Sequence, residues 1–473
     1  MSGRAPAPLP RARLAFYGDD FTGSTDALEA LAAAGFACAL FLQPPEPGSL
    51  AQYGALDAVG LAGHARGMTP AEMDEALPPL LRALGSLAPI VHYKVCSTFD
   101  SAPHVGNIGR VIEIARRTLG CGAVPVVAGN PALGRYCLFG HLYARSGTDG
   151  QVYRLDRHPI MRVHPVTPMD ESDLALHIGR QAPLRFAGLT LADLDRGPQA
   201  AEAAFQAALG SGAQAVLIDA ASAAHLTEAG RLLQAQAQAR GGQGPLFVVG
   251  SSGLQYALTQ WWQASGQGAA ATGCGAVPGE VQPVERVLAV SGSASALTAL
   301  QIEAGLAAGL VEVAVQPHEL LDEAAWPGVR EALAGQAVTI LSQGRSPLLH
   351  TARGPQDPRI GRMVEALVAA GRTPEAARQE GGRLLGQRLG ELTRAILQRA
   401  RVPRLLLAGG DTSSLVMQAL GPQALKVAAR LSPGAPLCSL HGGDPLAHGL
   451  QAALKGGQMG GPDFFERAWR GPA

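Results

Sequence analysis

The sequence lacks a net charge: its 473 residues contain 38 lysines and arginines against 38 aspartates and glutamates. Duplex nucleic acid and anionic membrane surfaces are usually bound through an excess of basic side chains. We therefore expect neither nucleic acid nor a membrane as a partner. Only local groups of basic residues remain to hold an anion, such as a small charged substrate.

Cysteine pairs and long apolar runs are also missing. The six cysteines are scattered with no C-x-x-C pair, which indicates reduced thiols. No stretch approaches the roughly 18 apolar residues of a membrane span, and the apolar run after the basic N-terminus ends at Asp19, too short for a signal sequence. We expect a cytoplasmic protein.

Several familiar motifs are absent as well. The dipeptide Gly-Lys occurs nowhere, which excludes a P-loop, and there is no G-x-G-x-x-G. The segment GSSG at 250–253 lacks the spacing of a nucleophile elbow, H-E-x-x-H is missing, and His141, His158 and His164 are not spaced as zinc ligands. The sequence predicts no metal-ligating side chains.

Short β-type runs alternate with Ala-rich helical patterns, which predicts an α/β protein with parallel sheets. A segment rich in Gly, Ala and Pro separates two series of such runs. We predict two α/β domains, each with a mainly parallel sheet flanked by helices: residues 1–262, a linker at 263–285, and residues 286–473. The predicted strands are 14–17, 37–42, 90–95, 124–127, 215–219, 245–249, 286–290, 337–342 and 404–408.

One helix is predicted in detail. Apolar residues between Leu384 and Leu397 recur with a helical period, so that one face should pack on a sheet. The strand at 404–408 follows, then a glycine turn and another helix. A ligand at that turn would meet a helix N-terminus.

Polar segments follow two predicted strands of the N-terminal domain, where open α/β sheets bind ligands. Asp19 and Asp20 follow the strand at 14–17 and could bind hydroxyl groups or act as a general base. The alternative for this segment is helix capping by Ser24 or Thr25, with Asp26 complementing the helix dipole.

The second polar segment begins at Lys94, which is costly at the end of an apolar strand unless it is paired or meets an anion. The alternative is a structural ion pair with Asp19, Asp20 or Asp100. The alternative for Asn107 is a simple helix cap. Further along the chain, Arg135 could bind a carboxylate through a bidentate pair of hydrogen bonds. The prolines at 164–170 indicate a loop of fixed shape.

Three segments of the C-terminal domain combine glycines with hydroxyl groups, at 291–298, 409–413 and 455–460. Glycine lets backbone amides approach a phosphate, and hydroxyl groups add donors. Tight turns and caps would explain any one of them, but three in one domain favour a phosphate site.

Taken together, these segments resemble the four-carbon acid sugar kinase family over nearly the full chain, from Asp19 to Phe465. The matching stretches are DDFTGSTD from Asp19, KVCSTFDS from Lys94, GNIG from Gly106, GR and GHL near 134 and 140, HPVTPM from His164, GSAS from Gly292 with Thr298, GGDTS from Gly409, and LKGGQMGGPDFF from Leu454. Four residues depart from the family pattern: Ala294, Asp411, Gly456 and Gln458.

The resemblance implies an N-terminal acid-sugar-binding domain and a C-terminal ATP-binding domain. The γ-phosphoryl group of ATP, with Mg²⁺ on its phosphates, would pass to the terminal hydroxyl of threonate, erythronate or an oxo-tetronate. Carried over by position, the substrate contacts are Asp20, Lys94, Ser97, Thr98, Asp100 and Arg135. The ATP contacts are Ser293, Ser295, Gly409, Gly410, Asp411, Thr412 and Gly457.

Phosphoryl transfer depends mainly on positioning and charge neutralisation. We expect Lys94 and Arg135 to hold the substrate carboxylate while Asp20, or else Asp19, orients or deprotonates the attacking hydroxyl. Two other classes stay open: a phosphotransferase working through an aspartyl-phosphate, and a non-catalytic acid-sugar sensor. Apolar helix faces are compatible with a homodimer.

Overall fold

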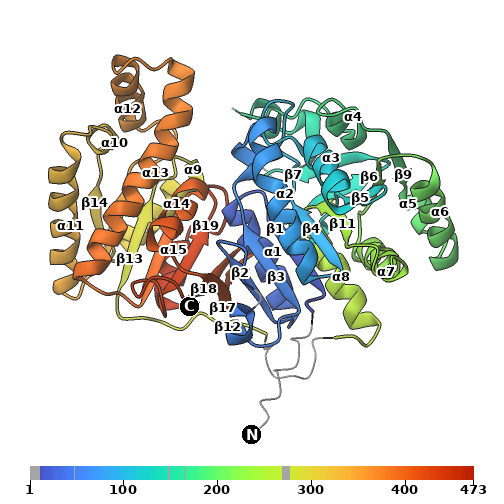
Figure 1. The fold of residues 1–473 in the computed structure, drawn as a ribbon. Coiled ribbons are helices and arrows are strands. Elements are labelled where there is room, and N and C mark those ends of the chain that lie inside the picture. Colours follow the sequence, from blue (N-terminus) through green and yellow to red (C-terminus); the bar gives the residue numbers. More distant parts are fainter. Residues whose placement is uncertain (1–10, 47, 148–149, 165, 269–276, 473) are drawn as a thin grey trace, which may run out of the picture. The chain divides into compact units, whose positions relative to one another are not determined.

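The computed structural model describes residues 11–46, 48–147, 150–164, 166–268 and 277–472, which form two compact units (Figure 1). One unit runs from Met1 to Val277 and the other from Pro278 to Ala473. Residues 269–276 of the predicted linker lie outside the described residues. None of the described helices has the length and apolar content needed to cross a membrane.

A parallel sheet forms the centre of the first unit, with the strand order β2-β3-β1-β4-β11-β5-β10-β9. Every residue of β1 is buried, and its last residue, Gly18, pairs with Ala62 on one side and Lys94 on the other. The carboxyl ends of β1, β3 and β4 therefore meet at one edge of the sheet. The strands are β1 (Leu14–Gly18), β2 (Cys38–Phe41), β3 (Ala58–Ala62), β4 (Ile90–Lys94), β5 (Val124–Val127), β9 (Phe186–Leu189), β10 (Ala215–Ile218) and β11 (Leu246–Gly250).

Local sequence signals set the ends of the helices in this unit. Thr69 and Glu72 form a capping box at the start of α2, and Asn107 caps α3, as predicted. Gly120, with a φ of +62°, ends α3 in a left-handed conformation that favours glycine. The helices are α1 (Phe21–Ala33), α2 (Pro70–Leu87), α3 (Ile108–Leu119), α4 (Leu174–Gly179), α5 (Leu191–Leu194), α6 (Pro198–Gly210), α7 (Ala223–Ala239) and α8 (Gly253–Ala264), with 3₁₀ turns η1 (Ser49–Tyr53), η2 (Ala65–Gly67), η3 (Pro131–Leu133), η4 (Leu155–Arg157) and η5 (Met161–Val163).

A small antiparallel sheet of β6 (Arg135–Leu138), β7 (His141–Arg145) and β8 (Val152–Arg154) is anchored by one buried carboxylate. Asp219, which follows β10, accepts hydrogen bonds from the amides of Phe139 at 2.6 Å, Gly140 at 2.9 Å and Leu191 at 3.2 Å. Phe139 itself is 64% exposed. The hairpin tip is thus fixed through its backbone rather than through its side chain.

The second unit contains its own sheet, in the order β14-β15-β13-β16-β19-β18-β17, with β12 pairing to β17. The pairs from β14 to β19 are parallel, and β18 runs antiparallel to both of its neighbours. The strands are β12 (Gly279–Glu280), β13 (Val287–Ser291), β14 (Val311–Ala314), β15 (Pro347–His350), β16 (Arg404–Ala408), β17 (Ala424–Ser432), β18 (Ala435–His441) and β19 (Gln451–Lys455).

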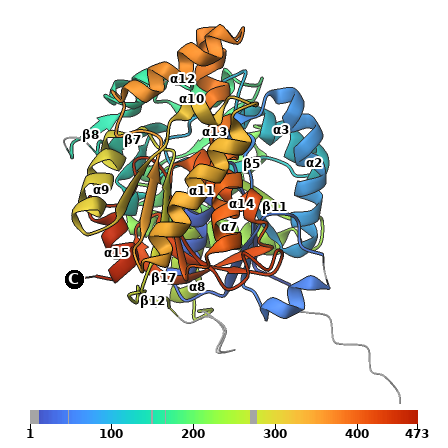
Figure 2. The ribbon, with the colours of Figure 1, turned by 90° about the vertical axis from the view of Figure 1, so that its left-hand side faces the viewer.

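Helices flank this sheet, so the predicted class of two α/β units with mainly parallel sheets is confirmed. The helix predicted near 384–397 is part of α13, and the strand, turn and helix expected after it are β16 and α14. The helices α11, α12 and α14 lie beside α13, and α11 and α13 lie side by side in both views (Figures 1 and 2). The buried Leu389 of α13 reaches the end of β13, where a Cβ on Gly292 would lie 3.1 Å from its Cδ1. The helices are α9 (Ala296–Ala307), α10 (Pro317–Leu320), α11 (Trp326–Ser342), α12 (Pro358–Ala369), α13 (Pro374–Arg399), α14 (Gly410–Leu420) and α15 (Phe464–Arg470).

The strand predicted at 337–342 is wrong. These residues are the last turns of α11, in which Ala337, Ile340 and Leu341 are buried at helical spacing. Gly344, with a φ of +73°, follows the helix, and the strand comes later as β15, whose four residues are all buried. The β-branched residues in the segment suggested a strand, but packing along one helical face decides the conformation.

Arg404 ties the two ends of the second unit together. It is 1% exposed, and its guanidinium donates to the carbonyls of Gln282 and Ala468 and to the side chain of Gln451. Arg404→Met should lower the free energy of unfolding of this unit by about 2–4 kcal/mol, because it leaves buried acceptors without a donor. Chemical denaturation followed by tryptophan fluorescence would measure the loss.

The matched control for this prediction is Arg362→Met, which changes an exposed arginine on α12 in the same way. It should leave the denaturation midpoint unchanged. Equal midpoints for Arg404→Met and the wild-type chain would contradict the structural role of Arg404.

Candidate functional site

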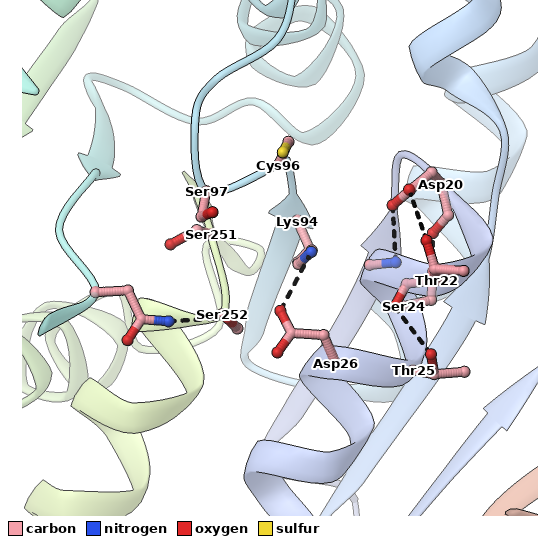
Figure 3. A network of polar contacts seen from close by, with 12 residues as sticks. Asp20, Thr22, Ser24, Thr25, Asp26, Lys94, Cys96, Ser97, Ser251 and Ser252 are labelled. Atoms are coloured by element: carbon pink, nitrogen blue, oxygen red, sulfur yellow. Dashed lines mark hydrogen bonds and ion pairs between the residues drawn. The ribbon is translucent and has the colours of Figure 1, made fainter. Parts of the chain in front are cut away.

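Polar residues gather where β1, β3, β4, β5 and β11 end in the first unit. Asp19 and Asp20 follow β1, Lys94 ends β4, and Ser251 and Ser252 follow β11. Figure 3 shows this region, with the side chains of Asp20, Lys94 and Asp26 among those drawn. The register that pairs Gly18 with Lys94 brings the first two of these segments together, as the sequence predicted.

Asp19 is bound on both oxygens by Arg66, an arginine in η2 just after β3. The guanidinium Nη2 lies 2.8 Å from Asp19 Oδ1, and Nε lies 3.1 Å from Oδ2. Burial raises the pKa of Asp19 despite this pairing, with the neighbouring Asp20 adding to the effect. Asp19 thus serves to hold Arg66 in place at the edge of the sheet.

Asp20 has a different environment and is the N-cap of α1. Its Oδ1 accepts from the amide of Gly23 at 2.9 Å, and its Oδ2 accepts from Thr22 at 3.1 Å and contacts Arg66 Nη1 at 3.0 Å. Burial would raise its pKa, but the charges of Arg66 and Lys94 hold it below its usual range. Its side chain is 26% exposed, against 5% for Asp19, so Asp20 is the carboxylate that a ligand can reach.

The capping residues suggested by the sequence were wrong. Ser24 and Thr25 lie inside α1, and their hydroxyl groups donate to the carbonyls of Asp20 and Thr22 at 2.6 and 2.9 Å. The helix begins directly after Asp20, several residues earlier than expected. The cap is therefore one of the two candidate site carboxylates.

Lys94 is 3% exposed and forms an ion pair with Asp26 of α1 at 3.6 Å (Figure 3). The structural pair considered in the sequence analysis named Asp19, Asp20 or Asp100 instead, because the sequence does not show that Asp26 turns towards β4. A Cβ atom on Gly23 would lie 2.5 Å from Lys94 Nζ and 2.2 Å from Asp20 Oδ1. Glycine at position 23 thus lets the ammonium and this carboxylate approach each other.

Arg135 lies at the start of β6 and has no carboxylate partner among the described residues. Its Nε donates to Ser97 Oγ at 3.1 Å, and its Nη1 donates to the carbonyl of Leu133 at 2.6 Å. Burial lowers its pKa. A partly buried guanidinium bound only to neutral groups retains the capacity to pair with an anion.

The loop after β4 is held in a strained shape. Phe99 is fully buried with a φ of +57°, which is rare for a bulky residue and typical of functional sites. Thr98, which precedes Phe99, donates to Oδ1 of Asp100, which follows it, at 2.6 Å. Thr98 also contacts Cys96 Sγ at 3.1 Å. Thr98 and Asp100 are therefore paired with each other, whereas Ser97 is the residue of this loop that contacts Arg135.

Arg66 was missed by the sequence analysis, and Asn130 was not among its proposed ligand contacts. Arg66 follows a strand of small residues that was not predicted, so nothing marked it as part of this edge. Asn130, after β5, donates to Ser252 Oγ at 3.0 Å and is fully buried, yet its Oδ1 has no partner among the described residues. In the loop predicted at 164–170, His164 Nδ1 accepts from the amide of Thr167, while residue 165 lies outside the described residues.

The three glycine and hydroxyl segments of the second unit converge at the ends of β13, β16 and β19. Ser295 is the N-cap of α9 and also donates to the carbonyl of Gly457. Thr298 Oγ1 lies 3.0 Å from Ser293 Oγ and 3.3 Å from the same carbonyl. We call Ser293, Ser295, Thr298 and Gly457 the hydroxyl cradle.

The glycine turn after β16 lies against this cradle. Gly409 has a φ of +118°, and a Cβ there would lie 3.4 Å from the amide nitrogen of Ser293 and 3.0 Å from Thr412 Oγ1. A Cβ on Gly292 would lie 2.2 Å from the same Thr412 oxygen. The two glycines thus allow the turn, Thr412 and the Ser293 amide to lie closer together than larger residues would permit. Closely spaced amide and hydroxyl donors of this kind suit a phosphate. Gly410 and Asp411 begin α14, and Asp411 is exposed.

The described residues contain no group of three or more His, Cys, Asp or Glu side chains arranged to hold a metal ion. A divalent ion that binds mainly through nucleotide phosphates needs one or two protein carboxylates at most. The residues present are compatible with that mode of binding.

Two family models match the chain: a sugar-binding N-terminal domain over residues 14–258 and a nucleotide-binding C-terminal domain over residues 288–465. A 3-oxo-isoapionate kinase of Paraburkholderia graminis is 43% identical over 453 residues, covering 96% of this chain and 93% of the relative. A 3-oxo-tetronate kinase of Cupriavidus necator is 30% identical over 463 residues, covering 97% of both chains.

A solved structure of a Salmonella typhimurium LT2 protein, named as a tRNA synthase, has a TM-score of 0.75 and 25% identity, covering 97% of this chain and 99% of its own. We take from it the similarity of fold. The two family models together span most of the sequence, and the relatives match it almost end to end. The chain therefore belongs to the four-carbon acid sugar kinase family and is a sugar-acid kinase.

Proposed function

We propose that this kinase transfers the γ-phosphoryl group of ATP to the terminal (C4) hydroxyl of a four-carbon acid sugar of the oxo-tetronate, threonate or erythronate type. Residues 1–262 bind the acid, residues 263–285 link the domains, and residues 286–473 bind the nucleotide. The observation that carries the proposal is Arg135, which has no carboxylate partner among the described residues and contacts Ser97 in the loop after β4, the strand that pairs with the one preceding Asp20.

The acid is held through its carboxylate. Arg135 pairs with no acidic side chain in the described part of the chain, and the contact of Lys94 with Asp26 is long at 3.6 Å, so both cations retain capacity for an anion. Ser97 orients Arg135 and stands ready to donate to the same carboxylate. The hydrogen bond between Thr98 and Asp100 holds the loop after β4 in shape. The same two side chains form hydrogen bonds with the hydroxyl groups of the sugar.

Asp20 orients the attacking hydroxyl and accepts its proton. Its lowered pKa keeps it ionised near neutral pH, so it is a weak base that acts mainly through a hydrogen bond. That is sufficient for phosphoryl transfer, in which positioning contributes more than proton abstraction. Asp19 supports this arrangement by fixing Arg66, whose Nη1 contacts Asp20.

The nucleotide phosphates lie in the hydroxyl cradle and against the turn from Gly409 to Thr412. Ser293 Oγ and the amide of Gly457 donate to phosphate oxygens, Ser295 holds the Gly457 backbone in place through its carbonyl, and Mg²⁺ bound to the phosphates would neutralise developing charge. Ala294 and Gln458 depart from the family pattern, but neither side chain takes part in the hydrogen bonds of the cradle.

The relatives' names support a 3-oxo acid as the first substrate to test. A coupled assay of ADP release across 3-oxo-tetronate, 3-oxo-isoapionate, threonate and erythronate should show turnover with at least one of them. Phosphorus–proton coupling in the product should place the phosphate on the terminal carbon. Acid binding without ADP release would favour a sensor, and trapping of the chain by beryllofluoride would favour an aspartyl-phosphate.

Two further expectations stay predictions. The described cysteines form no disulfide, which supports a reducing, cytoplasmic setting. A homodimer would be tested by light scattering of the purified chain.

A further inference from the structure

Lys455 is a fully buried cation at the end of β19; the sequence analysis counted it in the segment 455–460 but gave its side chain no role of its own. Its ammonium donates to Thr298 Oγ1 at 2.9 Å and lies 6.0 Å from the centre of the Phe464 ring. It forms no ion pair with any described residue. A buried ammonium without a counter-charge is costly unless an anion joins it.

The charged groups on the elements around β19 do not compensate for it. These titratable groups are Arg404 on β16, Cys438 and His441 on β18, Glu303 on α9, Asp411 on α14, Asp463 at the N-cap of α15, and Glu466, Arg467 and Arg470 on α15. Burial alone lowers the pKa of Lys455, to about 7, with no charged neighbour contributing. Lys455 is thus buried at a position where no described acidic side chain stabilises its positive charge.

Lys455 also connects all three glycine and hydroxyl segments. Its side chain reaches Thr298, which contacts Ser293 and the carbonyl of Gly457 in the hydroxyl cradle. Its backbone carbonyl accepts from the amide of Gly409 at 2.9 Å, at the start of the glycine turn. A charge on Lys455 therefore acts on the point where the nucleotide phosphates would lie.

We propose that Lys455 is a positioning residue that supplies the counter-charge of the nucleotide phosphates, and that its side chain takes up a proton from solvent when a nucleotide binds. The inference rests on the proposed function of the second unit as the nucleotide domain. Phosphate in the cradle stabilises the ammonium, and by linkage the ammonium strengthens phosphate binding. Thr298 transmits the effect, because it accepts from Lys455 and donates into the cradle.

The sign of the pH dependence follows from the lowered pKa. Below pH 7, Lys455 is protonated with and without nucleotide, so binding exchanges little proton at this group. Above pH 7, the free protein has lost this proton and binding restores it, so affinity should fall with rising pH, by at most about tenfold per pH unit.

The experiment is calorimetry of Mg²⁺-ADP binding to the full chain in pairs of buffers that differ in ionisation enthalpy. We expect net proton uptake on nucleotide binding at pH 8.0 and clearly less uptake at pH 6.5. In Lys455→Met, the part of the buffer dependence of the binding enthalpy that comes from Lys455 should disappear. Binding at pH 6.5 should also weaken by about tenfold, because one favourable charge interaction is lost. Proton exchange by the nucleotide itself remains in the variant and is subtracted.

The matched control is Lys426→Met, which removes the other lysine of the second unit, on β17. It should bind Mg²⁺-ADP with wild-type affinity and wild-type proton uptake. ADP binding by the wild-type chain with no proton uptake at pH 8.0 would overturn the inference alone, whether or not Lys455→Met folds. Absence of ADP binding at every pH would instead overturn the proposed nucleotide domain, and the inference with it.

Discussion

Asp20→Asn is expected to lower kcat by about 100- to 10,000-fold, the usual contribution of a positioned acid–base group. Asparagine caps a helix as well as aspartate does, so the bond from the Gly23 amide and the start of α1 are kept. What is lost is the charge that orients and accepts the substrate proton. Steady-state kinetics with saturating ATP and acid would measure the effect. The melting temperature should fall only slightly, because the variant loses the ion pair with Arg66 but keeps the helix cap.

The control for Asp20→Asn is Asp173→Asn, the same change at another N-cap, where the side chain accepts from the amide of Leu176 in α4. It should retain wild-type turnover. Wild-type turnover in Asp20→Asn would show that Asp20 is not the base, and Asp19→Asn would then be the variant to measure.

Gly409→Val should weaken nucleotide binding by at least about 100-fold. The φ of +118° at this position is hardly accessible to a β-branched residue. The new Cβ would also lie 3.0 Å from Thr412 Oγ1 and 3.4 Å from the Ser293 amide, so the turn and the cradle would be forced apart. Calorimetry with Mg²⁺-ADP measures the affinity.

The matched control for Gly409→Val is Gly361→Val on α12, where a Cβ would meet nothing within 4 Å. It should leave both ADP affinity and the melting temperature unchanged. If Gly409→Val fails to fold, the milder Gly409→Ala should still weaken binding, because alanine meets the same backbone strain. Unchanged ADP affinity in a folded Gly409 variant would contradict the phosphate turn.

The sequence predicted the fold class because alternating periods and glycine turns are local signals. It failed at residues 337–342, where β-branched side chains belong to a helix whose burial comes from distant neighbours. It also omitted β3, whose small residues carry no strand pattern. In the structure, Gly60 of that strand lies beneath the ring of Phe16, where a Cβ would come within 2.2 Å of Cζ. This contact between neighbouring strands exists only in the folded sheet, so the sequence alone does not show why a glycine stands at position 60.

The candidate site was predicted in part for the same reason. Asp19, Asp20 and Lys94 follow recognisable strands, so their meeting at one edge could be foreseen. Arg66 follows the strand that was omitted, and Asp26 reaches Lys94 only because α1 begins directly after Asp20. Which acid pairs with which base depends on helix phase, and one sequence does not fix that phase to within a residue.

The hairpin between β6 and β7 shows that an exposed loop is not always a tolerant one. Its tip carries the exposed Phe139, and such tips are usually the places where a chain accepts inserted segments. Here the amides of Phe139 and Gly140 are both committed to Asp219. An insertion at this tip would remove two donors from a buried carboxylate and release the strand that begins with Arg135. Segments inserted to engineer this enzyme should therefore not be placed in the hairpin between β6 and β7.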